Sequence, residues 1–403
     1  MAAVKISVND LRPGMYIVDS GLPWVEHPYL YAEEGLIRTL DQICEIVKQG
    51  FSEAYYDPER SHFDPPPTAN DLNKSASLSP KDTPAPKIPL SQGLKQAQKI
   101  YGQCVTQVRK FLSDARVGKI EFEASAPLVN GIIEGLNDNA DALVSLSKIK
   151  TYDEYTFTHC VNVAIFSAAF GRFLGMDGER LQRLTIAGLY HDIGKMRVPV
   201  EILNAPRKLT EKEFQIMQMH TLLVEECLPD PNEIDEEILC GIKEHHEKYD
   251  GSGYPRHLAG DEISLFGQLI SIADIYDALS SVRVYKDAMP PPKALSIMFE
   301  MRDKCWKPTL VENFIKMIGI YPVGTPVKLT RGFVGVVTKS NPESPLRPAT
   351  VLVQNPNGRD LTPPRIIDLS QHQEISIMHA LSPKEKAAAH LDVLSILTDN
   401  NVK

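Results

Sequence analysis

The spacing of apolar residues is that of a mixed α/β unit at the start of the chain. Apolar and polar positions alternate in "KISVNDL" and "GMYIVD", which predicts two strands joined by a turn at Pro13-Gly14. "GLIRTLDQICEIVKQG" has the spacing of an amphipathic helix ending at Gly50, and "SEAYYD" predicts a further strand. Residues 1–60 are therefore expected to form a small α/β domain.

The pattern then passes through a linker into helices. Residues 61–90 are rich in Pro, Ser, Asp and Lys and contain few apolar residues, which is typical of an extended linker. From residue 91 apolar residues recur three and four apart, as in "LKQAQKIYGQCVTQVRKFLSDA", and helical stretches follow one another to about residue 321. This predicts an all-α domain over 91–321 and makes the expected fold class mainly α.

Beyond Tyr321-Pro322 the residues become β-branched. "TPVKLT", "FVGVVTK" and "ATVLVQ" predict strands, and "NPNG" predicts a hairpin turn, so we expect a small β appendage over 322–378. In the tail, 379–403, Ser382 as N-cap and Pro383 at the first helical position predict a helix over "SPKEKAAAHLDVLSIL".

Composition and charge limit the classes of partner. The net charge of −9 offers no basic field for DNA or RNA. The six cysteines are scattered without a CxxC pair, which argues against disulfide frameworks and zinc fingers and favours a reducing cytoplasm. The N-terminus lacks the apolar region of a signal peptide, and the longest apolar stretch, 161–176, is too short and too polar to span a bilayer. We therefore expect a cytoplasmic protein without a membrane span.

Seven histidines and aspartates lie on or at the ends of these helical stretches, among apolar neighbours. Any one of them alone is more often a hydrogen-bonded core residue, but their joint occurrence in one domain favours a shared metal site. They are His159, His191, Asp192, His220, His245, His246 and Asp274.

Imidazole and carboxylate together suit a divalent metal such as iron or manganese. The two oxygens of Asp192 could bridge two metals roughly 3.5–4 Å apart, which would share a hydroxide and hold a phosphate in line for attack. Lys195 would share the helical face of His191 if that helix continued. Asp277 follows Asp274 by three residues, and Lys286 follows Arg283 by three, so the members of each pair would share a helix face.

"HDIGK", "HHEKYDGSGYP" and "ADIYDALSSVRVYK" together closely resemble the HD-GYP family, a subset of the HD metal-dependent phosphohydrolases. The resemblance covers roughly residues 130–320. The first sixty residues also resemble the small domain of unknown function that precedes some HD-GYP domains. The resemblance implies a bacterial cyclic di-GMP phosphodiesterase that opens its substrate to pGpG, often cut further to GMP, by means of a bridging hydroxide.

The family pattern implies a role for each matching residue. One metal would be held by His159, His191, Asp192 and Asp274, and the other by Asp192, His220, His245 and His246. Lys195 would lie beside the attacked phosphate, Arg283 and Lys286 would hold phosphate oxygens, and Asp277 would support a ligand or face the substrate. Gly253, Tyr254 and Pro255 would form a loop near the site. Iron is the metal that the family favours, with manganese also compatible.

One position departs from the family pattern. Some members have a Glu four residues before the first ligand histidine, where it supports a third metal, but this chain has Tyr155 there. We therefore expect two metals, with the role of Tyr155 open.

Several alternatives stay open from the sequence. The substrate could be cyclic GMP-AMP, or the chain could be a receptor that binds a cyclic dinucleotide without cutting it. A diguanylate cyclase is a possible protein partner through the Gly-Tyr-Pro loop. The helix expected at 91–118 could pair two subunits, although packing within its own domain explains its apolar pattern equally well.

Overall fold

The computed structural model describes residues 3–8, 11–19, 30–39, 42–43, 46, 51, 53–61, 85–116, 122–149, 155–227, 234–281 and 288–399. The chain divides into two compact units. The first is Met1–Asp82 with Phe173–Gly175, and the second is Thr83–Arg172 and Met176–Lys403.

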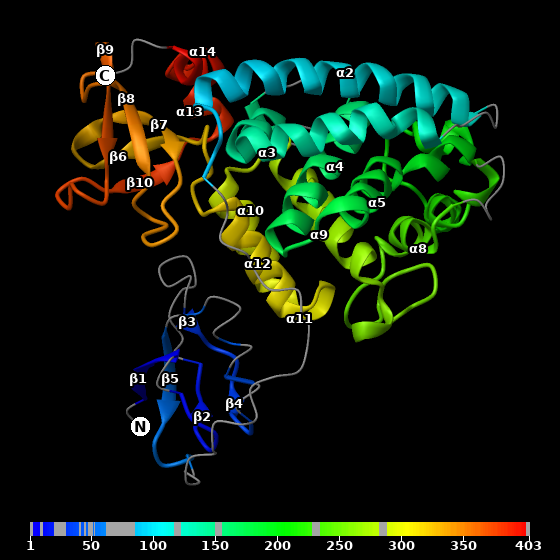
Figure 1. Cartoon of the computed structure of the whole chain (residues 1–403), viewed down its shortest axis with the longest axis horizontal. Helices are drawn as coiled ribbons and strands as arrows, with labels where there is room; N and C mark the ends of the chain where they lie inside the picture. The colour runs from blue at the N-terminus through cyan, green and yellow to red at the C-terminus, as the bar shows by residue number, and fades with distance from the viewer. Residues whose placement is uncertain are drawn as a thin grey trace. The chain divides into compact units, whose positions relative to one another are not determined.

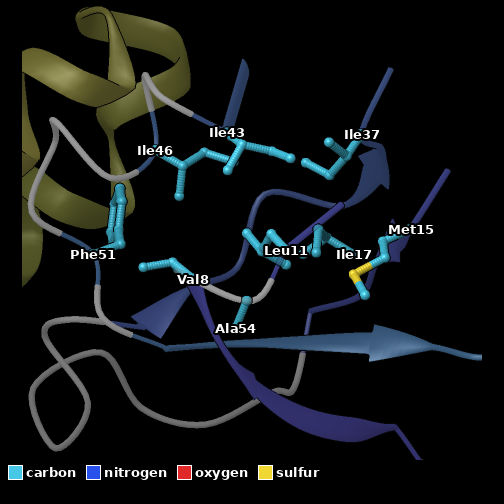
Figure 2. Packing of buried hydrophobic residues seen from close by; sticks show 9 residues of the cluster. All are labelled: Val8, Leu11, Met15, Ile17, Ile37, Ile43, Ile46, Phe51 and Ala54. Carbon is cyan, nitrogen blue, oxygen red and sulfur yellow. The ribbon is translucent and has the colours of Figure 1, made fainter. Parts of the chain in front are cut away.

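The first unit contains a sheet of short strands. These are β1 (Val4–Ser7), β2 (Tyr16–Ile17), β3 (Leu30–Tyr31), β4 (Gly35–Leu36) and β5 (Glu53–Asp57). The order is β1-β5-β2-β4 with antiparallel pairs, and β3 pairs with β5 in parallel. Among the residues of this unit that the structure describes, a buried apolar cluster is formed by Val8, Leu11, Met15, Ile17, Ile37, Ile43, Ile46, Phe51 and Ala54, as Figure 2 shows.

The helix predicted over 35–50 is wrong at its beginning, because Gly35–Leu36 form strand β4 beside β2. The polar residues that follow explain the later start. The Thr39 hydroxyl accepts from the backbone N–H of Gln42 (3.2 Å), and the Gln42 side chain accepts from that of Thr39 (3.2 Å). This reciprocal pair is a capping arrangement that starts a helix after residue 39. Gln42, Ile43 and Ile46 are helical, and Gly50 lies outside the described residues.

The second unit is mainly helical (Figure 1). Its long helices are α2 (Leu90–Arg116), α3 (Ala126–Ile149), α4 (Tyr155–Phe173), α5 (Gly178–Tyr190) and α9 (Leu265–Ser280). Shorter ones are α6 (Val200–Leu203), α7 (Glu211–Gln218), α8 (Glu236–Glu244), α10 (Pro291–Glu300), α11 (Arg302–Cys305) and α12 (Pro308–Ile318). Two 3₁₀ turns matter for the site: η3 (Ile193–Arg197) and η4 (Met219–Thr221). The mainly α fold class is confirmed.

The pattern of burial explains how the helices pack. The helix α2 buries a stripe that includes Leu94, Ala97, Tyr101, Val105 and Val108, and it runs beside α3 (Figure 1). In contrast, α4 and α9 are buried on nearly all sides, which places their polar residues in the interior. Among the described residues, no helix has both the length and the apolar content needed to cross a bilayer.

A five-stranded antiparallel sheet follows the helices, in the order β10-β6-β7-β8-β9. The strands are β6 (Pro326–Leu329), β7 (Val334–Lys339), β8 (Ala349–Gln354), β9 (Asp360–Asp368) and β10 (Ile377–Ala380). The sequence indicated β6 to β8 but not β9, which contains Pro363-Pro364. This strand lies at the edge of the sheet, where residues without an N–H donor are tolerated.

The tail forms two short helices, so the single helix predicted there is wrong. Ser382 caps α13 (Pro383–Ala388) as expected, in a reciprocal pair with Glu385. His390 then has a positive φ of 50°, which ends the helical path, and the Asp392 side chain caps α14 (Val393–Thr398).

Candidate metal centre

Three histidines stand where helical segments end. His191 is the C-cap of α5, His245 is the C-cap of α8, and His220 lies in η4 directly after α7. Each Nδ1 contacts the carbonyl oxygen three residues earlier, at 2.9 Å for His191, 2.7 Å for His220 and 2.6 Å for His245. Helix ends leave such carbonyls without intrahelical partners. Because a carbonyl only accepts, Nδ1 carries the proton and Nε2 presents a lone pair.

His159, on α4, is oriented by a side chain instead. Its Nδ1 lies 2.8 Å from Asp277 Oδ2, and Asp277 also accepts from Lys148 Nζ (2.9 Å), Asn162 Nδ2 (2.8 Å) and Ser281 Oγ (2.8 Å). Asp277 is fully buried and is absent from the described lining of the cavity. Of the two roles expected for Asp277, this position favours support of a ligand over contact with substrate.

Asp192 lies between two groups of imidazoles. Its Oδ2 is 3.3 Å from His191 Nε2 and 3.8 Å from His159 Nε2. Its Oδ1 is 3.4 Å from His220 Nε2 and 3.9 Å from His245 Nε2. Ligand atoms gather in two overlapping groups: His159, His191 and Asp192, and Asp192, His220, His245 and His246. Asp274 Oδ1 is 3.1 Å from His159 Nε2 and so adjoins the first group.

The donor atoms of these groups fit a bound metal. The Nε2 atoms of His191, His220 and His245 and the Oδ1 of Asp192 are buried and have no hydrogen-bond partner in the described protein. Buried polar atoms without partners are rare, and lone pairs that face a carboxylate at 3–4 Å repel it. Cations between these atoms would remove both costs, and the mixture of imidazole and carboxylate suits iron or manganese.

The charge states of His220, His246 and Asp192 are those that metal binding needs. His159 differs, because burial would lower its pKa but Asp274 and Asp277 outweigh burial and raise that pKa to about 9, so a metal would have to displace its proton. Burial, together with the Lys195 ammonium, lowers the pKa of His220 to about 3. Burial also lowers the pKa of His246 to about 4. Burial by itself would raise the pKa of Asp192, but Lys195 and His191 outweigh it and hold that pKa well below its usual range. The imidazoles of His220 and His246 are therefore neutral and Asp192 is charged at neutral pH.

Lys195 reaches the site by another route than the one predicted. The helix does not continue past His191, because α5 ends at Tyr190 and residues 193–197 form the 3₁₀ turn η3. In a 3₁₀ turn side chains three apart eclipse each other, so Lys195 lies over Asp192 with Nζ 2.5 Å from Oδ2. Although burial opposes it, Asp192 raises the pKa of Lys195, which stays an ammonium.

Gly194 explains part of "HDIGK". A Cβ at this position would overlap the carbonyl oxygen of His220, so only glycine lets η3 pack directly against η4. This close approach brings Asp192 and His220 together.

The Gly-Tyr-Pro loop borders the site on the side of His246. The Tyr254 ring is 4.8 Å from the His246 ring and 6.5 Å from the His220 ring, and its backbone N–H donates to the His246 carbonyl (3.1 Å). A Cβ at Gly253 would overlap the backbone of residues 247–248. Pro255 is half-buried beside Tyr254.

Two buried glutamates flank the histidine pair and hold this loop. Glu247 accepts from the backbone N–H of Arg256 (2.6 Å) and of Leu258 (3.1 Å). Glu244 accepts from the backbone N–H of Ser264 (2.7 Å) and pairs with the guanidinium of Arg256. Sequence reasoning missed both residues, although charged residues on either side of a histidine pair were a visible signal.

A cavity of 680 Å³ opens beside the histidine and aspartate cluster. Its polar lining includes His159, Asp192, Lys195, His220, His246, Tyr254 and Asp274, and also Arg109, Ser113 and Arg116 of α2. The sequence did not predict the contribution of α2, because a polar helix face has the same residue pattern whether it borders a cavity or bulk solvent. Arg283, Lys286 and the side chain of Tyr155 lie outside what the structure describes, so their expected roles stay predictions.

Comparison with known proteins gives three family matches. An HD domain matches residues 134–310, a domain of unknown function (DUF3391) matches residues 3–122, and a KOW domain associated with the HD domain matches residues 326–389. The second match extends past the boundary expected at residue 60 and includes α2.

Curated relatives match the chain over different lengths. The cyclic di-GMP phosphodiesterase PA4108 of Pseudomonas aeruginosa is 30% identical over 386 residues, which cover 94% of this chain and 92% of that protein. The 3'3'-cGAMP-specific phosphodiesterase 3 of Vibrio cholerae is 40% identical over 169 residues, 42% of this chain and 36% of that protein. A cyclic di-GMP phosphodiesterase of Thermotoga maritima is 34% identical over 179 residues, 44% of this chain and 49% of that protein.

The resemblances inferred from the sequence, to HD-GYP proteins and to an N-terminal domain of unknown function, are thus confirmed. Since the P. aeruginosa relative matches nearly from end to end, the chain belongs to the HD-GYP family of metal-dependent phosphodiesterases.

Proposed function

We propose that this protein hydrolyses cyclic di-GMP to pGpG, and further to GMP, at a site that holds two metal ions. The observation that carries the proposal is the position of Asp192, whose two oxygens face two different groups of buried imidazoles. The names of the P. aeruginosa and T. maritima relatives support cyclic di-GMP as the substrate.

The proposed ligands divide around Asp192. His159, His191, Asp192 and Asp274 would hold one cation, and Asp192, His220, His245 and His246 would hold the other. Two cations bound there would supply an acidified water as nucleophile and would neutralise charge on phosphoryl oxygens. Iron and manganese both accept this ligand set.

The protein's own groups position and neutralise the substrate. Lys195 keeps its proton on Nζ and can donate it in hydrogen bonds to an oxygen of the attacked phosphate, where negative charge grows in the transition state. Tyr254 forms part of the cavity wall and limits access of water beside His246. Arg283 and Lys286 are proposed to bind phosphate oxygens.

Cyclic GMP-AMP is the second candidate substrate, because the V. cholerae relative is named for it. Metal ligands do not contact the base, so other residues of the cavity would distinguish cyclic GMP-AMP from cyclic di-GMP. A receptor that no longer cuts is less well supported, because every predicted metal ligand lies at the cluster.

The test is a metal analysis combined with hydrolysis time courses on both dinucleotides. We expect about two transition-metal ions per chain and turnover of cyclic di-GMP, with both lost in Asp192→Ala. His379→Ala is a matched control, because His379 is an exposed histidine on β10 that pairs with Glu385. A fully metallated protein that binds cyclic di-GMP and never cuts it would support the receptor alternative and overturn the proposal.

A further inference from the structure

One face of α2 lines the cavity. The α2 residues in the lining are Arg109, Leu112, Ser113 and Arg116, whose spacing of three, four and seven places them on one side of the helix. The two arginines are two turns apart, so their Cα atoms are separated by about 10 Å along the axis. Lys195, at the metal cluster, lines the same cavity.

Contacts made by other residues of α2 hold the helix in place beside the metal cluster. The Tyr101 hydroxyl donates to Asn162 Oδ1 (2.7 Å), and Asn162 in turn bonds to Asp277. Further along, the Phe111 ring packs on the ring of Tyr190, which precedes His191, at 5.7 Å between centroids. At the end of the helix the guanidinium of Arg197, in η3, donates to the carbonyls of residues 116 (3.5 Å) and 226 (2.6 Å). The helix is therefore part of the site's framework.

The chemistry of the two arginines suits a phosphate. Their side chains are exposed, and the Arg109 guanidinium lies 5.5 Å from the centre of the Phe157 ring, which also lines the cavity. Guanidinium groups match the geometry of phosphate oxygens with paired N–H donors. In a chain of net charge −9, local cations must supply the attraction for an anionic substrate.

A cyclic dinucleotide has two phosphodiesters, and only one is attacked at a time. Asp192, Asp274 and Lys195 are grouped at the cluster, where the attacked phosphate would lie. Among the described lining residues, Arg109 and Arg116 are the cations that come from α2 and not from the elements that carry this group.

We propose that Arg109 and Arg116 bind the phosphodiester that is not being cleaved. This inference rests on the proposed function and adds a substrate subsite to it. The subsite is supplied from outside the HD domain match, which begins at residue 134, and from within the DUF3391 match, which ends at residue 122.

The experiment compares two substrates and two double variants. In Arg109→Ala/Arg116→Ala we expect KM for cyclic di-GMP to rise about tenfold for each arginine lost, with kcat and metal content unchanged. Bis(p-nitrophenyl) phosphate has a single phosphodiester, so its hydrolysis should be unaffected. Lys95→Ala/Lys110→Ala is the matched control, since it removes the same charge from exposed positions of α2 that are absent from the described lining.

The outcomes separate this inference from the function on which it rests. An unchanged KM in the arginine variant, or an equal loss on both substrates, overturns the subsite and leaves the enzyme intact. An equal rise of KM in the lysine control also overturns it, because the effect would then be one of net charge. A wild-type protein that cuts neither cyclic dinucleotide overturns the proposed function itself.

Discussion

Lys148→Met tests how His159 is held in place. Lys148, on α3, has only 15% of its side chain exposed, and its Nζ lies 2.9 Å from Asp277 Oδ1. The ammonium also lies over the rings of Phe166 (4.3 Å) and Tyr276 (4.8 Å). Methionine keeps the length and the apolar packing of the side chain but removes the charge.

The expected loss of stability in Lys148→Met depends on the hydrogen-bond donors that Asp277 retains. Removing one partner of a buried ion pair costs about 3–5 kcal/mol when the other charge is left alone. Asp277 retains three donors, from His159, Asn162 and Ser281, so we expect a loss of about 2–3 kcal/mol in the free energy of unfolding. Because Asp277 orients the His159 ring, metal affinity should also fall about 10–100-fold.

The assay measures both the free energy of unfolding and the metal affinity, and a general packing defect would change the first without the second. Urea unfolding of the metal-free protein measures stability, and a metal titration of the folded protein measures affinity. Lys148→Arg retains the charge and should recover most of the affinity, and Lys110→Met on the exposed side of α2 should change neither readout. Metal affinity equal to that of the wild type in Lys148→Met would refute the reasoning.

Three further predictions concern the same centre. Gly194→Ala should cost roughly 3 kcal/mol of stability in thermal melts and lower the metal content, because the new Cβ would displace η3 from His220. Gly102→Ala is the control, because nothing lies within 4 Å of its new Cβ, and it should be neutral or stabilising in the same melts. In the metal-free protein the pKa values of His220 (about 3) and His246 (about 4) lie below the ordinary value near 6.5, so the unfolded chain binds more protons below that pH. The stability that these two neutral imidazoles contribute should therefore be complete above about pH 6.5 and fall as the pH drops toward about 3, and a pH series of urea melts that His246→Asn leaves equally steep below pH 6.5 would contradict this. His159 acts in the opposite sense, because burial would lower its pKa but Asp274 and Asp277 outweigh burial and raise that pKa to about 9, so its contribution is lost as the pH rises from about 6.5 to about 9. Glu247→Ala should leave the backbone N–H groups of Arg256 and Leu258, next to the Gly-Tyr-Pro loop, without acceptors. We expect a loss of about 2–4 kcal/mol in the free energy of unfolding, and hydrogen exchange should become faster in that loop alone.

The sequence predicts well those features that depend on residue type and on the spacing of apolar residues. The apolar spacing indicated α2 and the mainly helical second unit, and imidazoles with carboxylates on successive helices indicated a metal centre. The detailed approach of side chains was less accessible. Lys195 was placed by helical phase, but the change to a 3₁₀ turn after His191 moved it onto Asp192.

Contacts between distant residues could not be read from local patterns. Lys148 is 129 residues from Asp277, and nothing near either residue indicates that they pair. The arginines of α2 looked like ordinary solvated residues of an amphipathic helix. Gly194 also stands where a close backbone approach leaves no room for a side chain, a role that the sequence analysis did not predict.

The hydrogen bonds that orient the histidines differ in whether a substitution can remove the acceptor. His191, His220 and His245 rely on main-chain carbonyls, which every amino acid possesses, so single-residue replacements at 188, 217 or 242 do not delete the acceptor. His159 depends on the carboxylate of Asp277, which one nucleotide change can abolish. A side-chain substitution can therefore free the His159 ring from its acceptor, whereas the rings of His191, His220 and His245 keep theirs for as long as the backbone keeps its path.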